Sequence, residues 1–227
     1  MIAYIADFLS ADAVSALVVE LSSVRFANGL ATAGWNAREV KNNLQLTPGM
    51  AGYDAAAQRV HAAFASNAIF QMAVRPQLMH PILFNRYDAG MAYGRHIDDA
   101  IMTVAGSPPR ALRTDVSFTL FLSDPASYEG GGLAIDTGGA EQSLKPPAGT
   151  LVAYPSDALH WVEPVTSGSR LAAVGWVQSE VRDPRQRAIL YDLDRVRRAL
   201  FAKDGKTDAF DILTRCHSNL LRQWAEL

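Results

Sequence analysis

The chain is poor in cysteine and has no long apolar run, and each absence excludes a class of protein. One cysteine, Cys216, occurs in 227 residues, so no disulfide can form within the chain and an oxidising compartment gains no support. No stretch approaches the roughly 20 apolar residues that cross a bilayer. Residues 1–7 lack a basic start and reach an acid early, which argues against a secretory signal. We therefore expect a cytoplasmic protein without a membrane partner.

The chain also lacks an excess of charge of either sign. Its formal net charge is −2 at pH 7, which argues against nucleic acid as a partner. The balance is uneven, because residues 1–180 carry 11 basic and 16 acidic side chains whereas residues 181–227 carry 10 and 7. With 49% hydrophobic residues, the chain can bury one substantial core and has room for a small appended element.

Hydrophobic spacing predicts helices near the N-terminus and short strands after residue 76. Ser10 is a suitable N-cap for a helix to residue 23, and a second helix is expected over residues 53–66. Residues 2–5 and 40–46 have strand character. Later strands are expected over residues 81–87, 92–97, 115–122, 133–135, 150–154, 159–162 and 171–177. So many short strands separated by turn signals favour a β-sandwich or barrel over a parallel α/β sheet.

The last part of the chain returns to a helical pattern. Asp183 followed by Pro184 is typical of a helix start, and Thr207 or Asp208 can cap a second helix. The predicted fold class is therefore mainly β with flanking helices and a C-terminal two-helix hairpin. We expect a main domain over residues 1–180, with N-terminal helices in 1–75 and a β core in 76–180. Residues 181–227 are expected to form a small helical extension, which offers a surface for self-association.

The stretch from Tyr93 to Asp98 carries the strongest chemical signal. In an extended strand successive side chains alternate faces, so His96 and Asp98 point the same way. These two groups offer two ligands of a 2-His-1-carboxylate iron site, and His160, on another expected strand, can supply the third. A His-x-Asp pair alone is a weak signal, because a surface hydrogen-bonded pair has the same pattern.

Arg170 follows His160 by ten residues and adds a permanent cation. A turn between them would fold Arg170 back beside the metal position, where a guanidinium is suited to hold the far end of a dicarboxylate. Two imidazoles, a carboxylate and this arginine predict a non-haem Fe(II) dioxygenase that consumes 2-oxoglutarate.

Further motifs extend this interpretation to nearly the whole chain. They are Val40-Lys-Asn-Asn-Leu-Gln45, Gly90-Met-Ala-Tyr-Gly-Arg-His96, Ser117-Phe-Thr-Leu-Phe-Leu-Ser-Asp124, Tyr154-Pro-Ser156, Pro164-Val-Thr-Ser-Gly-Ser-Arg170 and Asn219-Leu-Leu-Arg-Gln-Trp224. With these motifs the chain resembles the bacterial PKHD-type (PiuC-like) hydroxylases, which are related to prolyl hydroxylases. It departs from them at Gly132, where Glu is usual, and at Trp161, where Arg is usual. Neither position is a metal ligand.

The resemblance implies a double-stranded β-helix (jelly-roll) core and a set of cofactors. Fe(II) would be held by His96, Asp98 and His160, with 2-oxoglutarate and O₂ as cosubstrates, succinate and CO₂ as co-products and ascorbate as reductant. Arg170 would pair with the 5-carboxylate of 2-oxoglutarate. Tyr87 occupies the position of a tyrosine that hydrogen-bonds 2-oxoglutarate in related prolyl hydroxylases, although a tyrosine in the core would show the same pattern.

Several polar residues are candidates for the pocket. Ser117 and Thr119 share one face of their strand, and so do Asn43 and Gln45, which could form a polar wall for the substrate or simply a polar sheet edge. Tyr93 shares the strand of His96, but its spacing places it on the opposite face unless a bulge intervenes.

The substrate does not follow from these residues. Kinship with prolyl hydroxylases suggests a peptide or an amino-acid-like small molecule, and the link of the group to iron uptake suggests a siderophore-related compound. Two alternatives stay open. In a cupin-like metal enzyme that does not use 2-oxoglutarate, Arg170 would be incidental. In a non-catalytic jelly-roll binding module, the ligand set would be vestigial.

Overall fold

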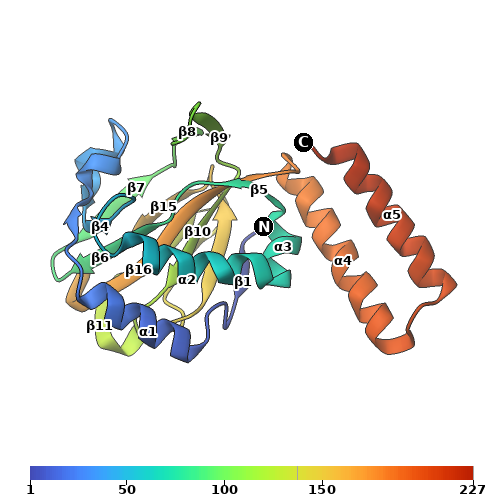
Figure 1. The fold of residues 1–227 in the computed structure, drawn as a ribbon, viewed down its shortest axis with the longest axis horizontal. Helices are drawn as coiled ribbons and strands as arrows, with labels where there is room; N and C mark the ends of the chain where they lie inside the picture. Colours follow the sequence, from blue (N-terminus) through green and yellow to red (C-terminus); the bar gives the residue numbers. More distant parts are fainter. Residues whose placement is uncertain (137, 227) are drawn as a thin grey trace.

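The computed structural model describes residues 1–136 and 138–226, so Thr137 and Leu227 of the predicted ranges lie outside the description. Two antiparallel sheets form a jelly-roll core, with helices against one side and a separate helix pair at the C-terminal end (Figure 1). This architecture confirms the predicted fold class.

The larger sheet has nine strands in the described part of the chain and lies between the helices and the cavity. Its main path runs β1 (Ala3–Ile5), β14 (Leu151–Pro155), β10 (Val116–Phe121), β16 (Val165–Ser179), β6 (Leu83–Asp88), β4 (Leu44–Leu46) and β2 (Ala27–Asn28), and β11 (Tyr128–Gly130) and β5 (Pro76–Met79) also pair with β16. On β10, Val116, Phe118 and Leu120 join the hydrophobic core, whereas Ser117 and Thr119 line a cavity. The sheet therefore has one apolar face and one face available for chemistry.

The smaller sheet lies over the cavity and carries two of the candidate ligands. Its order is β13 (Glu141–Leu144), β12 (Leu133–Asp136), β15 (Leu159–Val162), β7 (Ala92–His96) and β3 (Lys41–Asn42), and a separate hairpin joins β8 (Ile101–Val104) to β9 (Arg110–Arg113). The sequence did not indicate β8, β9 or β13. Their residues are mostly exposed or half-buried, so they lack the apolar alternation that marks a strand.

The strand character expected for residues 40–46 is confirmed, but it is divided between two short strands in different sheets. The chain leaves the smaller sheet after β3, which pairs with β7, and enters the larger sheet at β4, which pairs with β6. Asn43 is the residue at the crossing between the two sheets. The alternation of side chains in this stretch could not reveal the change, because it does not report which partner each half of the strand chooses.

Three helices cover the apolar face of the larger sheet (Figure 1). They are α1 (Ala11–Ser22), α2 (Tyr53–Ser66) and α3 (Ala68–Val74), and shorter 3₁₀ turns are η1 (Gly29–Thr32), η2 (Ala37–Val40) and η3 (Pro125–Ser127). Ser10 caps α1 by accepting a hydrogen bond from the Ala13 N–H at 3.2 Å, as predicted. Helix α3 was not predicted; it is short, and Asn67 caps it at the Phe70 N–H.

Aromatic packing joins these helices to the sheet. The ring of Phe64 lies 4.8 Å from that of Phe8, 4.7 Å from that of Phe70 and 4.8 Å from that of Phe118, all in tilted or edge-on geometry. Such contacts contribute about 0.5–1.5 kcal/mol per pair beyond simple burial. The largest hydrophobic cluster therefore lies between the helices and the larger sheet, and smaller apolar clusters and the polar cavity residues share the opposite face of that sheet.

The C-terminal helices α4 (Pro184–Asp204) and α5 (Asp208–Trp224) pack side by side and project away from the sheets (Figure 1). Asp183 caps α4 with Pro184 as the first helical residue, and Thr207 caps α5, as the sequence predicted. Within the described residues, no helix combines the length and the hydropathy that a membrane span needs.

A buried contact fastens α5 to the end of α3. Arg75 Nη2 lies 2.9 Å from His217 Nε2, and because a guanidinium can only donate, the imidazole accepts and must be neutral. Burial, together with the nearby cations Arg197 and Arg75, lowers the pKa of His217, while Asp194 opposes this effect. Protonation of His217 would remove the acceptor and add a positive charge beside a guanidinium.

We predict that this contact makes stability depend on pH. Because folding depresses the pKa of His217, its contribution is complete above the unfolded pKa of about 6.5 and declines as pH falls below that value. The unfolding free energy should therefore drop between pH 7.5 and pH 5 by more in the wild type than in His217→Gln, by about 1.4 kcal/mol per unit of pKa depression. Urea unfolding at both pH values measures the difference.

His61 and His80, whose pKa values burial also lowers, are present in both proteins, so their effects cancel in this comparison. The glutamine can accept the Arg75 hydrogen bond without titrating. An identical pH dependence in the two proteins would contradict the proposed role of His217.

Candidate active site

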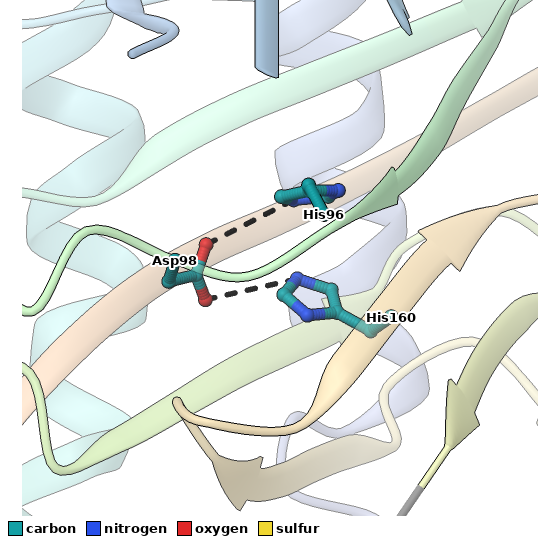
Figure 2. Close-up of side chains that lie close together, drawn as sticks. All are labelled: His96, Asp98 and His160. Atoms are coloured by element: carbon teal, nitrogen blue, oxygen red, sulfur yellow. Dashed lines mark ion pairs between the residues drawn. The ribbon is translucent and has the colours of Figure 1, made fainter. Parts of the chain in front are cut away.

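The two candidate histidines face each other across neighbouring strands. His96 on β7 and His160 on β15 are direct partners in the antiparallel register, and their ring centroids are 4.3 Å apart. β7 ends at His96, so Asp98 lies in the segment after the strand and not on it, contrary to the expectation from alternation. The segment nevertheless turns the Asp98 carboxylate towards both imidazoles, with one oxygen directed at each ring (Figure 2).

The three side chains fit a single metal ion. His96 Nε2 lies 3.9 Å from Asp98 Oδ1, and His160 Nε2 lies 3.7 Å from Asp98 Oδ2. The donor atoms all lie within 4.8 Å of one another, and metal–ligand bonds of about 2.1 Å require separations of about 3–4 Å. A small inward movement would close this set around one ion. Two imidazoles and one carboxylate with open positions are the donor set of non-haem Fe(II) oxygenases.

Backbone carbonyls fix which nitrogen of each imidazole is free. His96 Nδ1 lies 2.8 Å from the Gly94 oxygen, and His160 Nδ1 lies 3.0 Å from the Ala158 oxygen. A carbonyl oxygen only accepts, so both Nδ1 atoms carry the proton and both Nε2 lone pairs point towards Asp98. Burial and the neighbouring His160 lower the pKa of His96 to about 4, so this imidazole is neutral at pH 7 and available to a metal.

The third ligand is also held in place by hydrogen bonds. Ser117 Oγ donates to Asp98 Oδ2 at 2.6 Å, and it lies 2.8 Å from Ser156 Oγ. Because Ser117 has one hydroxyl hydrogen, Ser156 is the donor in the second contact. The ring of Tyr154 packs edge-on against His160 at 5.0 Å. Ser117 was predicted to be a pocket residue, whereas these supporting roles of Tyr154 and Ser156 were not predicted.

Tyr93 was expected on the face opposite His96 unless a bulge intervened, and the structure has such a bulge. Its ring stacks on that of His96, with centroids 3.7 Å apart and 19° between the planes, and it lines the cavity. The register explains the difference. Between the pairs His160–His96 and Val162–Tyr93, β7 contains one residue more than β15. This bulge reverses the alternation and brings Tyr93 and His96 to the same face.

Arg170 lies in the same cavity, and two of its guanidinium nitrogens have no hydrogen-bond partner among the described residues. It is 1% exposed, and its Nε and Nη2 atoms have no hydrogen bond among the described residues. Its position on β16 is opposite Tyr87 on β6, and its guanidinium lies 5.3 Å from the Tyr87 ring and 5.1 Å from the Phe121 ring. A buried cation with unused donors fits a bidentate carboxylate.

Two tyrosines lie around this guanidinium. Burial raises the pKa of Tyr87 to about 12 against the opposing effect of Arg170, so its hydroxyl stays protonated and can donate. Tyr128 is 3% exposed, and its hydroxyl has no partner among the described residues. Gly131 makes the close approach possible, since a Cβ atom there would lie 3.2 Å from Arg170 Cδ and 3.0 Å from the Tyr128 ring. The sequence analysis did not identify Tyr128.

The remaining predicted pocket residues divide into two groups. Gln45, Ser117 and Thr119 line the cavity that contains the triad. Asn43 does not line it, because the chain changes sheets at that residue, so Asn43 and Gln45 do not form the common wall that was expected. The Asn43 amide is buried and has no hydrogen-bond partner among the described residues. Lys41, Thr32 and Asn85, which the sequence analysis had not singled out, line the cavity beside Gln45.

The two departures from the family pattern have local explanations. A Cβ atom at Gly132 would lie 2.4 Å from Ser143 Oγ and 2.5 Å from Glu163 Oε2, so the Glu163 carboxylate occupies the space that a larger residue would need. The ring of Trp161 stacks under the Arg95 guanidinium at 4.0 Å. Neither position contributes to the metal set, in agreement with the sequence analysis.

Comparison with known protein families gives two matches that together span most of the chain. Residues 82–178 match the 2OG-Fe(II) oxygenase superfamily, and residues 185–226 match the PKHD-type hydroxylase C-terminal domain. The first match contains the triad and Arg170, and the second covers α4 and α5. A PKHD-type hydroxylase of a Synechococcus strain is 48% identical over 227 residues, which is 100% of both chains.

Solved structures share the fold at lower identity. A prolyl-4-hydroxylase from Pseudomonas putida superimposes with a TM-score of 0.50 and 24% identity, over 78% of this chain and 92% of that one. The non-haem α-ketoglutarate-dependent epimerase SnoN from nogalamycin biosynthesis superimposes with a TM-score of 0.55 and 14% identity, over 81% and 80%. The same jelly roll thus serves more than one reaction, and the fold alone does not identify a substrate.

We predict that the Ser117–Asp98 hydrogen bond supports metal binding. In Ser117→Ala the carboxylate loses a donor that orients it, and groups in this position typically affect metal affinity 10–100-fold. Anaerobic titration with Fe(II), or with Co(II) as a spectroscopic substitute, should show a loss in that range. Thr119→Val, on the same face but without a ligand contact, is the matched control. Equal affinities in the two variants would refute the assignment.

Proposed function

The chain belongs to the PKHD-type hydroxylases of the 2OG-Fe(II) oxygenase superfamily, and from this premise we propose that it hydroxylates a peptidyl or amino-acid-like substrate. Fe(II) is bound by His96, Asp98 and His160, and 2-oxoglutarate is the cosubstrate. The two alternatives lose their support. A cupin-like enzyme independent of 2-oxoglutarate disagrees with the family, and a non-catalytic module disagrees with an intact ligand set.

The two unpartnered guanidinium nitrogens of Arg170 are the observation that supports the position of 2-oxoglutarate. Its free Nε and Nη2 donors are buried in the cavity of the triad, and a 5-carboxylate would satisfy both. We assign the Tyr87 hydroxyl to the same carboxylate, because Tyr87 lies opposite Arg170 in the sheet register. The other end of the dicarboxylate would then lie towards the triad.

When bound, Fe(II), 2-oxoglutarate and O₂ supply the oxidising chemistry, in which 2-oxoglutarate yields succinate and CO₂ while one oxygen atom passes to the substrate. The contribution of the protein is geometric. Gly94 and Ala158 hold the imidazoles, Ser117 holds the carboxylate, and the walls limit the access of water. We also propose ascorbate as the reductant that keeps the iron ferrous, on the basis of the prolyl-hydroxylase relationship.

The substrate class has weaker support. A solved prolyl-4-hydroxylase shares the fold, which is the reason for proposing a peptide or an amino-acid-like molecule, and a siderophore-related compound is a second candidate from the link of the family to iron uptake. Gln45, Thr119 and Tyr93 line the cavity and are proposed to contact the substrate. Asn43 lies outside the lining, and we propose for it only a structural role at the crossing between the two sheets. We further propose residues 1–180 as the oxygenase domain and 181–227 as its helical extension.

The proposed function is tested by the visible spectrum of the anaerobic complex. Adding 2-oxoglutarate to the Fe(II)-loaded protein should produce a metal-to-ligand charge-transfer band. The band should disappear in His96→Ala and in Asp98→Ala, because each removes a ligand. Absence of the band in the wild type, with Fe(II) demonstrably bound, would count against 2-oxoglutarate as cosubstrate.

Loss of the Arg170 side chain should weaken 2-oxoglutarate binding without affecting the metal. A charge-assisted contact of this kind contributes about 1.5–3 kcal/mol, so Arg170→Met should raise the dissociation constant of 2-oxoglutarate about 10–100-fold. Titration of the charge-transfer band measures the constant. Arg182→Met, which removes an exposed arginine, serves as the control. Unchanged 2-oxoglutarate affinity in Arg170→Met would rule out this assignment.

A further inference from the structure

One wall of the cavity consists of four hydrogen-bonded polar side chains. One of them is a lysine, and the reaction described above does not use its positive charge. Lys41 Nζ donates to Thr32 Oγ1 at 2.8 Å, Thr32 Oγ1 donates to Gln45 Oε1 at 2.5 Å, and Gln45 Nε2 donates to Asn85 Oδ1 at 2.7 Å. All four residues line the cavity that contains the triad, and we call them the Lys41 row. The series of hydrogen bonds begins at Lys41, because an ammonium group only donates.

The lysine at the head of this row is buried without a counter-charge. Lys41 is 7% exposed, and no carboxylate lies within 4 Å of its Nζ atom among the described residues. It makes one hydrogen bond to a side chain, and so retains donors for a further acceptor. Burial lowers the pKa of Lys41 to about 8, with Asp98 opposing the shift, so the ammonium form still predominates at pH 7. Burying an unpaired cation costs folding free energy unless a bound ligand supplies a negative charge beside it.

The position of Lys41 relates it directly to the reacting centre. On β3 it is the register partner of Tyr93, and its Nζ lies 5.2 Å from the centroid of the Tyr93 ring. The Tyr93 ring in turn stacks on His96 at 3.7 Å. Lys41 is thus separated from a metal ligand by one aromatic ring, on a wall that a bound molecule would touch.

A charge balance indicates what that molecule would bring. With Fe(II) and the 2-oxoglutarate dianion bound, their charges cancel with those of Asp98 and Arg170. Lys41 is then the remaining buried charge among the described cavity residues. Asp99 also lines the cavity, but it is exposed to solvent and forms no ion pair with Lys41. A loaded site would therefore complement one negative charge.

We propose that Lys41 binds a carboxylate of the substrate, which makes the substrate a free amino acid, a related carboxylic acid or a chain with a free C-terminus. Thr32 accepts a hydrogen bond from the ammonium group and holds it in place, and Gln45 and Asn85 hold the Thr32 hydroxyl in its orientation. This inference rests on the proposed function, since it concerns the second substrate of that site. A purely structural Lys41, which only ties η1 to β3 through Thr32, would give no preference for a charged ligand.

The experiment compares matched charged and neutral probes on the loaded protein. Zn(II), which is redox-inactive, replaces Fe(II), and saturating 2-oxoglutarate blocks Arg170. The binding of N-acetyl-L-alanine and N-acetyl-L-alaninamide is measured by saturation-transfer NMR, and acetyl-tetra-alanine and its amide form the second pair. We expect each acid to bind about tenfold more tightly than its amide, and whichever pair binds better shows whether a single residue or a chain end is preferred.

The same measurements on variants connect the preference to the residue. Lys41→Met should abolish the preference, so that acid and amide bind about equally. Lys41→Arg should retain the preference, and Thr32→Val should reduce it in part. Lys203→Met, which removes an exposed lysine of α4, should leave it unchanged. If Lys41→Met does not fold, the pair Lys41→Arg and Thr32→Val still tests the hydrogen bond that holds Lys41.

Two results would overturn the inference. One is equal binding of acid and amide by the wild type, and the other is a preference for the acid that survives in Lys41→Met. A separate titration of 2-oxoglutarate identifies a different failure. If the wild type does not bind 2-oxoglutarate, the proposed function is wrong, and the carboxylate assignment fails only because its premise has failed.

Discussion

The direct pairing of His96 with His160 across β7 and β15 is the constraint on which the site depends. Residues opposite each other in an antiparallel pair have Cβ atoms about 4.5–5.5 Å apart, close enough for two imidazoles to share one ion. A slip of one residue would turn one ring to the other face and abolish the site. The same pairing positions the end of β7, and the chain leaves it in the direction that brings the Asp98 carboxylate to face both rings. Metal binding is thus a consequence of strand register.

Burial prepares these ligands before a metal arrives. Burial keeps the His96 imidazole neutral, and the carbonyl oxygens of Gly94 and Ala158 orient both rings at no cost in side-chain entropy beyond that already lost in folding. The single carboxylate is held by Ser117. A divalent ion would then meet ligands whose orientation is already set, which is the preorganisation expected of a site that must stay accurate within half an ångström.

Local patterns were sufficient for much of this structure. The alternation of β10 correctly gave the faces of Ser117 and Thr119, and the caps at Ser10 and Asp183 correctly marked helix starts, because each depends on neighbours in sequence. The gaps have one origin. The face of Tyr93 could not be decided because a bulge is a property of two paired strands. Asn43 was placed in the pocket because a change of sheet depends on distant partners, and Lys41 was missed because its burial comes from η1 and β7 together.

The two buried cations of the cavity differ from the rest of the interior, because their burial does not stabilise the fold. Arg170 and Lys41 both lie in low-dielectric surroundings without a carboxylate, and each arrangement opposes folding. The fold tolerates them because its stability is generated on the opposite face of the larger sheet, where Phe64 and its neighbours pack α1 to α3 against β10.

Replacing either cation by an apolar side chain would be expected to stabilise the protein or leave it unchanged. A charge that opposes stability and faces a cavity is explained by what the cavity binds, and for Arg170 the 5-carboxylate of 2-oxoglutarate is the proposed explanation. By the same reasoning the unpaired ammonium group of Lys41 requires an anion, and the substrate is the partner of the site that has yet to be identified.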